Sequence, residues 1–526
     1  MYYYYYYAKR FNGFKIGNLE VTNNEVLGTN TFEFVDMDSS PESIYFSVVI
    51  GPNGTGKSEL LRVLLLLLRN ICLIEQGKPP TPISGTYRLA YANNGKDYIF
   101  TNISENSVDL KRKKAYSKTK PYLRENLERR SFENASDTLP KSIVANSIML
   151  TDKFIVPRNK EEESSFPMYK YLGVRNRPQQ ASARYYVRKT VEFIVQQVNS
   201  EPFKLGMEKL TEFLELKKSI KISYKTALSP KFWKADVSKD DFDNYFLTID
   251  KKYKKSGKIA PFKVSQYKSF SKLEYAVENI CKFIQNLVKN NRLQHIAYSP
   301  AKYLIYDIID NDSHAELKEH YKFLDQLRQL GLVHAPEVLV TKDQEVELQN
   351  TSSGEFHLFS TMVALMATVN ENSLILIDEP EISLHPNWQM KYNTFIRQLF
   401  SETLFSTCHV IIATHSHFLI SDLPGDYSNI IGLKKENDKI ETVKLESNTY
   451  GWSAEQVLLD IFQVPTTRNY FIAEKLASIM KKASLNNFKA IEEHKADLLD
   501  WRGSLTDNDP LKYAIVKLIE KAGWQD

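Results

Sequence analysis

The chain has 526 residues, of which 42% are hydrophobic, 25% charged and 12% aromatic. This composition is that of an ordinary globular protein and excludes a collagen, a disordered tail and a disulfide-rich miniprotein. Lysine and arginine exceed aspartate and glutamate by only five, 69 against 64, so the overall charge does not indicate a nucleic-acid-binding protein. At about 150 residues per domain, the length predicts two to four domains.

The cysteines and the apolar segments indicate the compartment. Cys72, Cys281 and Cys408 are far apart and include no pair at zinc-ligand spacing, which favours a reduced, intracellular environment. The start lacks the basic region and apolar stretch of a signal peptide. The most apolar segment, 60–74, is interrupted by two arginines and is too short to span a bilayer. We therefore expect a cytoplasmic protein without a membrane segment.

Hydrophobic periodicity predicts an α/β chain. The segments with strand character are, in order, 14–21, 31–35, 45–50, 147–150, the hairpin 337–349, 373–377 and 409–413. The segments with helical character are 58–74, 204–217, 272–289, 314–329 and the chain from 453 onward. The continuous apolar run at 45–50 is typical of a strand buried on both faces. No repeat of 20–50 residues and no sustained heptad pattern is present.

A phosphate-binding motif lies between the predicted strand at 45–50 and the predicted helix at 58–74. Residues 51–58 read Gly-Pro-Asn-Gly-Thr-Gly-Lys-Ser and fit G-x-x-x-x-G-K-[ST], and this strand–helix context disfavours a chance match in a glycine-rich turn. Backbone N–H groups and the helix N-terminus can surround phosphate oxygens. Lys57 is expected to reach the β and γ phosphates of ATP and Ser58 to hold Mg²⁺. The predicted nucleotide-binding residues are Gly51, Asn53, Gly54, Thr55, Gly56, Lys57 and Ser58.

A second apolar strand ends in two carboxylates, Asp378 and Glu379. Asp378 can bind Mg²⁺ directly or through water, and Glu379 is placed to orient and deprotonate the attacking water. Two acidic turn residues are the simpler alternative. His415 follows the next predicted strand. A histidine at a strand end is usually structural, but its position after the acidic pair favours a γ-phosphate sensor.

A further motif precedes the acidic strand by 19 residues (374 minus 355): residues 351–355 read Thr-Ser-Ser-Gly-Glu just before a predicted helix. With its motifs in this order, the chain resembles the head of ABC-type ATPases. The corresponding segments are Walker A at 51–58, the signature at 351–355, Walker B at 374–379, the D-loop near 383–385 and the switch histidine His415.

The sequence departs from this family at two points. Thr351 replaces the leading leucine of the signature, and no glutamine-loop residue is assigned, because Thr151-Asp152 stand where a glutamine is usual. The resemblance implies that Ser352 and Gly354 contact the γ-phosphate, and we group Ser353 with them. It also implies catalysis by Glu379, His415 and Lys57, and a homodimer that sandwiches two ATP molecules with Mg²⁺.

The implied fold is α/β: a P-loop NTPase head of the ABC type with a mostly helical insertion and a helical C-terminal region. The expected parts are 1–180, the N-terminal part of the head with a basic insertion near 105–135; 181–330, the inserted mainly helical domain; 331–445, the C-terminal part of the head; and 446–526, the helical C-terminal region.

The 300 residues between Walker A and the signature (351 minus 51) are too many for a compact transporter subunit, and no long coiled coil fills them. A globular insertion of this size is typical of the overcoming-lysogenization-defect and Septu ATPases. Residues 168–175 resemble the Y-x-Y-L-G-x-R stretch of Septu ATPases (PtuA), and 450–464 resemble the start of their C-terminal region. Residues 507–509, Asp-Asn-Asp, are a near match to the D-x-D motif of a metal-binding nuclease domain. Their position in a loop before a predicted helix favours a helix-capping role instead.

The Septu resemblance implies a partner, a PtuB-like HNH nuclease, and in some retrons also a reverse transcriptase with its RNA–DNA hybrid product. The sequence thus predicts an ATP-hydrolysing sensor or scaffold of an anti-phage defence complex that controls this nuclease. Two alternatives stay open: a DNA-repair clamp similar to SMC and RecF proteins, and a scaffold that binds ATP tightly and scarcely hydrolyses it.

Two local basic clusters are candidate DNA or RNA contacts. Residues 111–130 contain nine basic and two acidic residues, a local charge of +7, and Tyr116 and Tyr122 are interleaved with the basic residues. Surfaces that bind phosphates and stack bases have this composition. A second cluster lies at 251–255. A solvated loop is the simpler alternative for each. The residues proposed for nucleic-acid contact are Lys111, Arg112, Lys113, Lys114, Lys118 and Lys120.

Six consecutive tyrosines, Tyr2–Tyr7, stand at the start of the sequence. One of them could stack on adenine, as aromatic residues near the N-terminus do in ABC heads. The run could also form an aromatic surface for a partner. A third hypothesis is that six tyrosine codons make synthesis sensitive to the supply of tyrosine tRNA.

Overall fold

The computed structural model describes the following residues: 11–36, 44–104, 118–126, 128–177, 180–227, 231–273, 275–295, 301–400, 406–421, 423, 427–436, 439–444, 474–476, 478–480, 492–505 and 510–524. The tyrosine run, Lys111–Lys114, the stretch 450–464 and the motif at 507–509 lie outside these residues. By internal contacts the chain divides into two units, Met1–Gly451 and Trp452–Asp526.

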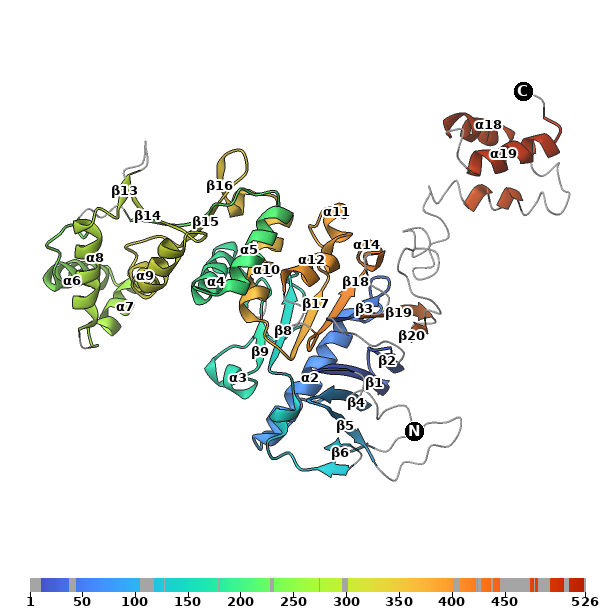
Figure 1. The fold of residues 1–526 in the computed structure, drawn as a ribbon, viewed down its shortest axis with the longest axis horizontal. Helices are drawn as coiled ribbons and strands as arrows, with labels where there is room; N and C mark the ends of the chain where they lie inside the picture. The colour runs from blue at the N-terminus through green and yellow to red at the C-terminus, as the bar shows by residue number, and fades with distance from the viewer. Residues whose placement is uncertain are drawn as a thin grey trace. The chain divides into compact units, whose positions relative to one another are not determined.

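The first unit contains a mainly parallel sheet of seven strands, in the order β20-β19-β3-β18-β17-β8-β9 (Figure 1). Its strands are β3 (Tyr45–Ile50), β8 (Ser142–Ser147), β9 (Tyr169–Tyr171), β17 (Ser373–Asp378), β18 (His409–Thr414), β19 (Ser428–Glu436) and β20 (Lys439–Lys444). Only the edge pair β19–β20 is antiparallel. Every residue of β3, β8, β17 and β18 is buried, as expected for strands covered on both faces.

A second, antiparallel sheet has the order β2-β1-β4-β5-β6-β7. Its strands are β1 (Lys15–Asn24), β2 (Gly28–Glu33), β4 (Thr86–Asn93), β5 (Lys96–Ile103), β6 (Lys118–Glu125) and β7 (Glu128–Arg130). The sequence predicted β1 and β2 but assigned no strands to β4–β7. The basic stretch that follows β5 therefore continues into a sheet, with Lys118 and Lys120 exposed on β6.

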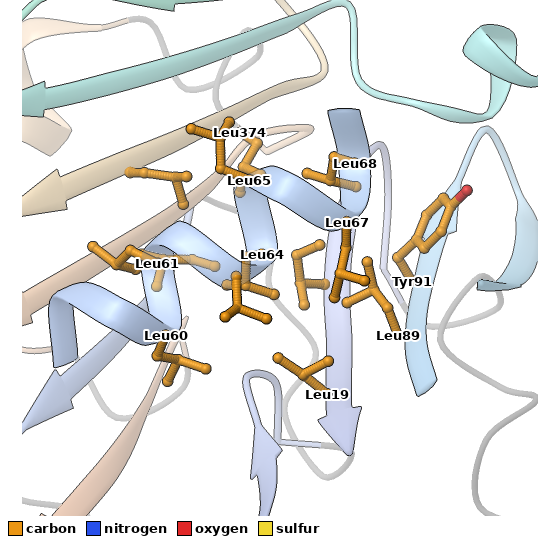
Figure 2. Packing of buried hydrophobic residues seen from close by; sticks show 14 of the residues in the cluster. Leu19, Leu60, Leu61, Leu64, Leu65, Leu67, Leu68, Leu89, Tyr91 and Leu374 are labelled. Carbon is orange, nitrogen blue, oxygen red and sulfur yellow. The ribbon is translucent and has the colours of Figure 1, made fainter. Parts of the chain in front are cut away.

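Helix α2, Lys57–Glu75, is apolar around most of its circumference because both sheets cover it. Figure 2 shows its leucines pointing toward Leu374 of β17 as well as toward Leu19 and Leu89 of the antiparallel sheet. A helix that is hydrophobic on all sides is stable only when it is buried on all sides. This packing holds α2, and with it Lys57 at its N-terminus, against the parallel sheet.

The insertion between the two halves of the head contains helices and a third sheet. Its helices are α4 (Ala183–Gln196), α5 (Glu201–Phe213), α6 (Lys239–Lys255), α7 (Phe262–Phe270), α8 (Ala276–Lys289) and α9 (Asn311–Gln329), whereas the short helix α3 (Lys160–Ser165) lies within the head between β8 and β9. The antiparallel sheet has the order β13-β14-β12-β15-β16. Its strands are β12 (Ile220–Lys225), β13 (Gln294–His295), β14 (Lys302–Asp307), β15 (Glu337–Thr341) and β16 (Glu345–Glu347). A two-stranded ribbon of β10 (Arg175–Arg177) and β11 (Gln180–Ala181) precedes it in the chain. The insertion is mainly helical, as predicted, but the sequence assigned no strand to β12, β13 or β14. The predicted hairpin at 337–349 supplies β15 and β16, which lie beyond the expected boundary at 330.

The second half of the head adds α10 (Ser353–Thr368), α11 (Pro386–Gln389), α12 (Tyr392–Leu399) and α14 (Phe418–Ser421). Helices α4 and α5 of the insertion pack on α10, and α5 also packs on α12. The insertion is therefore joined to the head through the helix that follows the signature segment.

The predicted strand at 147–150 is wrong. Strand β8 ends at Ser147, where it pairs with Asp378 at the end of β17. Beyond this point the chain leaves the sheet, and Leu150 is 56% exposed. The apolar run Ile148-Met149-Leu150 resembled a buried strand, but the parallel register places the strand before it. The other strands predicted at 14–21, 31–35, 45–50, 337–349, 373–377 and 409–413 are confirmed to within a few residues.

The second unit is described for four short segments and is mainly helical there, as predicted. Helices α18 (Lys495–Ser504) and α19 (Pro510–Lys521) share an apolar cluster with Leu476 and Ile479. No helix within the described part of the chain is long and apolar enough to cross a membrane.

Candidate functional site

The predicted site residues follow three adjacent strands of the parallel sheet. The order β3-β18-β17 places the phosphate-binding loop, His415 and the pair Asp378-Glu379 after neighbouring strand ends. The register aligns these ends, since Ile50 pairs with Thr414 and Ala413 with Asp378. In α/β sheets, ligands bind at the carboxyl ends of the strands. The topology therefore gathers motifs that lie more than 300 residues apart in the sequence (378 minus 51).

The phosphate-binding loop curves around the ammonium group of Lys57. Gly54 and Gly56 have φ values of +81° and +84°, a backbone region open mainly to glycine. The buried Lys57 Nζ donates to the carbonyl oxygens of Gly51 at 2.9 Å and Pro52 at 3.2 Å. The ammonium group thus lies inside the loop, where a phosphate oxygen would meet it.

Ser58 and Asp378 lie together, as the two motifs predicted. Ser58 Oγ donates to Asp378 Oδ1 at 3.0 Å. Burial, together with the nearby carboxylates Glu379 and Asp152, raises the pKa of Asp378 to about 7. A divalent cation bound at Asp378 would balance the negative charge of these neighbouring carboxylates. Because a hydroxyl and a carboxylate are ligands that Mg²⁺ accepts, the residues fit a magnesium site.

Glu379 occupies the centre of the site. Its carboxylate lies 3.5 Å from Lys57 Nζ and contacts His415 Nδ1. Its backbone has φ +51°, unusual for a residue other than glycine, and its N–H donates to Ala413 O at 2.8 Å. Strained backbone of this kind persists where the surroundings hold it and is frequent at functional sites.

The signature segment forms the N-terminus of α10. Ser352 Oγ accepts from Glu355 N at 3.2 Å, and Glu355 accepts from Ser352 N at 3.1 Å, which is a capping box. Ser352 and Ser353 are exposed. A Cβ atom at Gly354 would lie 2.3 Å from the carbonyl oxygen of Ser383, so the glycine allows the D-loop to approach the helix.

The signature and the phosphate-binding loop of the same chain are not joined. Among the described residues, no hydrogen bond or ion pair links 351–355 with 51–58. Thr351, which departs from the family pattern, uses its hydroxyl locally and donates to Leu348 O at 2.7 Å. Ser352, Ser353 and Gly354 thus do not meet Lys57 and Ser58 within one chain.

The stretch 168–175 has a structural explanation that the sequence did not reveal. Arg175 Nε and Tyr171 Oη each donate to Asp152 Oδ2 at 2.8 Å. Asp152 lies in the segment that leaves β8 beside Asp378, and Lys153 next to it binds Glu59 of α2 at 2.9 Å. The stretch therefore anchors the segment where a glutamine loop is expected. In the sequence, this role could have been inferred from Tyr171 and Arg175 of the Y-x-Y-L-G-x-R pattern, which are the residues that bind Asp152.

Glu381 was also missed. Its carboxylate accepts hydrogen bonds from Thr414 Oγ1 at 2.5 Å and from His415 N at 2.7 Å. A third carboxylate two residues after Glu379 was visible in the sequence, but only the pairing of β17 with β18 brings it to the loop that carries His415.

The basic candidates are only partly described. Lys118 and Lys120 are exposed on β6, and Arg124 and Arg129 lie over the ring of Tyr122 at 5.6 and 5.0 Å from its centroid. Lys111, Arg112, Lys113 and Lys114 lie outside the described residues. The cluster 251–255 forms the end of α6.

A mainly parallel sheet, a glycine-rich loop before a helix and an acidic strand end define a P-loop NTPase, with the motif order of an ABC-type head. Residues 46–421 match the family described as "AAA domain, putative AbiEii toxin, Type IV TA system". This match covers most of the chain, which therefore belongs to that family. Membership supports nucleotide binding and ATPase activity in general.

Two curated relatives are similar to this chain. The Septu protein PtuA of Bacillus thuringiensis is 23% identical over 232 residues, 43% of this chain and 52% of the relative. The Retron Vc95 probable ATPase of Vibrio cholerae serotype O1 biovar El Tor is 24% identical over 184 residues, 32% of this chain and 34% of the relative. The chain thus matches about half of one relative and a third of the other, and the resemblance to Septu ATPases is confirmed.

The chain also aligns with a solved structure, the SMC head domain from Thermotoga maritima. The TM-score is 0.36 and the identity 11%, and the alignment covers 82% of this chain and 100% of that domain.

Proposed function

We propose that this chain is an ATP-binding and ATP-hydrolysing dimeric sensor or scaffold of a prokaryotic anti-phage defence complex that controls a partner HNH nuclease. A retron is one setting for such a complex. The observation that carries the enzymatic part is the convergence of Lys57, Ser58, Asp378, Glu379 and His415 on one edge of the sheet.

Each of these residues has a role that its position supports. Lys57 binds the β and γ phosphates, and Ser58 with Asp378 would hold Mg²⁺, which neutralises phosphate charge. Glu379 orients a water molecule and accepts its proton, since its carboxylate lies beside Lys57 at the centre of the site. His415 contacts Glu379 from the neighbouring strand and senses the γ-phosphate.

Dimerisation would complete the site. Ser352 and Ser353 are exposed at the N-terminus of α10, where a helix favours an anion. A second copy can supply these residues to the phosphates held by Lys57.

We expect the Glu379→Gln variant to form a dimer with Mg²⁺ and ATP and to be a monomer without nucleotide, because bound ATP then bridges two chains. Adding Ser353→Arg should abolish the dimer, since a bulky cation blocks the helix N-terminus. Ser164→Arg, at another exposed helical serine, is the matched control. Sedimentation velocity measures the state; a dimer that survives Ser353→Arg would contradict the arrangement.

The partner is tested by co-expression with the neighbouring genes. Isolation of this chain in a stable complex with an HNH nuclease would support the defence complex. A complex with a recombination protein would favour the alternative, an ATP-dependent DNA clamp similar to SMC and RecF proteins.

Nucleic-acid contact is a second proposed function, favoured by a region at the end of α6 and in α7. Residues 251–273 contain eight lysines and no acidic residue. Phe262 in the same region is 69% exposed and offers a ring on which a base can stack. Lys118 and Lys120 on β6 are a separate exposed pair.

Charge reversal at these positions should weaken the binding of DNA or RNA. It should also make binding less sensitive to salt: the slope of the logarithm of the binding constant against the logarithm of the salt concentration should become shallower by about one for each phosphate that the variant no longer binds. The variants are Lys251→Glu with Lys252→Glu, Lys118→Glu with Lys120→Glu, and the set Lys111→Glu, Arg112→Glu, Lys113→Glu and Lys114→Glu. Lys318→Glu with Lys322→Glu on α9, both exposed, is the matched control. Filter binding at several salt concentrations measures the slope, and unchanged binding in all three variants would refute nucleic-acid contact here.

A further inference from the structure

Glu381 has no role in the mechanism above, yet its carboxylate is directed at the catalytic loop. The residue is 5% exposed and follows β17. Its Oε1 accepts hydrogen bonds from Thr414 Oγ1 at 2.5 Å and from His415 N at 2.7 Å, and lies 3.1 Å from His415 Nδ1. Its Oε2 is buried and has no hydrogen-bond partner among the described residues. The hydrogen bonds of this carboxylate thus converge on the switch-histidine segment.

Two carboxyl groups share the imidazole of His415. Its Nδ1 contacts a carboxylate oxygen of Glu379 and one of Glu381. Burial, together with the adjacent charge of Glu379, raises the pKa of Glu381 to about 7. A buried carboxyl group is costly unless its hydrogen bonds offset the loss of water. The donors to Glu381 are Thr414 and His415, in the segment that carries the proposed catalytic histidine. This location favours a functional role for the Glu381 carboxylate.

Gln389 of α11 holds the same segment from the other side. Its Nε2 donates to Leu384 O at 2.9 Å, and its Oε1 accepts from Ser416 Oγ at 2.6 Å. Ser416 N in turn donates to Thr414 Oγ1 at 2.9 Å. Residues 414–416 are therefore attached at both ends to the segment that follows Walker B.

We propose that Glu381 is a positioning residue for ATP hydrolysis, which fixes the backbone and the imidazole of His415 beside Glu379, and that Gln389 completes this hold. The inference rests on the proposed ATPase function. Without Glu381, the imidazole keeps only Glu379 as a carboxylate partner, and its half-exposed ring can rotate away from the position that a γ-phosphate requires. Nucleotide binding by Lys57 and Ser58 does not depend on this contact.

The test is a double-mutant cycle between Glu381→Ala and His415→Ala, with kcat and KM for ATP measured at each corner. We expect Glu381→Ala to lower kcat about tenfold or more with KM changed less than about threefold, and to have less than about a twofold effect when His415 is already alanine. Glu381→Gln, which keeps an acceptor for Thr414 and His415 N, should restore part of kcat. Glu371→Ala, at an exposed carboxylate before β17, is the matched control and should leave kcat unchanged.

The outcomes separate this inference from the function on which it rests. A wild-type protein without turnover would overturn both. A Glu379→Gln variant as active as wild type would leave the ATPase function standing but would overturn the positioning role, because His415 would then not be held beside a catalytic base. An active wild type, an inactive Glu379→Gln and an effect of Glu381→Ala that persists in full without His415 would overturn the positioning role alone. If Glu381→Ala does not fold, the same cycle is read with Glu381→Gln and Gln389→Ala, and independence from His415 again contradicts the proposal.

Discussion

Replacing Glu379 with glutamine is expected to lower the rate of ATP hydrolysis by about 10²–10⁴-fold, the usual contribution of a general base. The amide has nearly the shape of the carboxylate but cannot accept a proton from water. Nucleotide binding should persist, because Lys57, Ser58 and Asp378 are unchanged and a negative charge 3.5 Å from Lys57 is removed. Phosphate release at saturating ATP measures the rate, and equilibrium binding of a fluorescent ATP analogue measures affinity.

Glu371→Gln is the matched control for this substitution, since that exposed side chain lies outside the site. Equal turnover by wild type and Glu379→Gln would show that Glu379 is not the base. Slow turnover in both, with tight binding, would favour the alternative of a scaffold that holds ATP without hydrolysing it.

Replacing Arg175 with methionine is expected to reduce the free energy of unfolding by about 3–5 kcal/mol, the usual cost of removing one partner of a buried ion pair. The Asp152 side chain is fully buried and that of Arg175 is 9% exposed. Two hydrogen bonds of the guanidinium, one to Asp152 Oδ2 and one to Phe154 O, are each 2.8 Å long. Methionine fills much of the volume but leaves the carboxylate without its cation.

Urea denaturation followed by circular dichroism measures this change in stability. Lys189→Met breaks a partly exposed pair with Glu192 on α4 and should cost less than about 1 kcal/mol. The double variant Asp152→Asn with Arg175→Met should be less destabilised than the sum of the single changes, because no unpaired charge remains buried. A destabilisation below about 1 kcal/mol for Arg175→Met would show that Asp152 does not need this partner.

The sequence alone predicts the chemistry of the site, because each motif is short and contiguous. The segment 51–58 carries its glycines, lysine and serine within one turn, and Asp378-Glu379 follow an apolar strand. Hydrophobic runs of a regular period located most strands and α2, since burial on one or two faces leaves a local pattern. ATP, Mg²⁺ and the P-loop fold class could therefore be predicted from the residues alone.

The tertiary structure decided what depends on contacts between distant segments. Strand β8 ends at Ser147 because its partner β17 ends opposite it, at Asp378. The apolar run in the sequence continues to Leu150. In the sheet of the insertion, β12 pairs with β14 and β15 across long stretches of chain, so the sequence predicted the local hairpin β15–β16 but not β12 or β14. Glu381 reaches His415, and Arg175 reaches Asp152, only after neighbouring strands have aligned. Local patterns specify elements and motifs, whereas the partners of buried polar groups are chosen by packing.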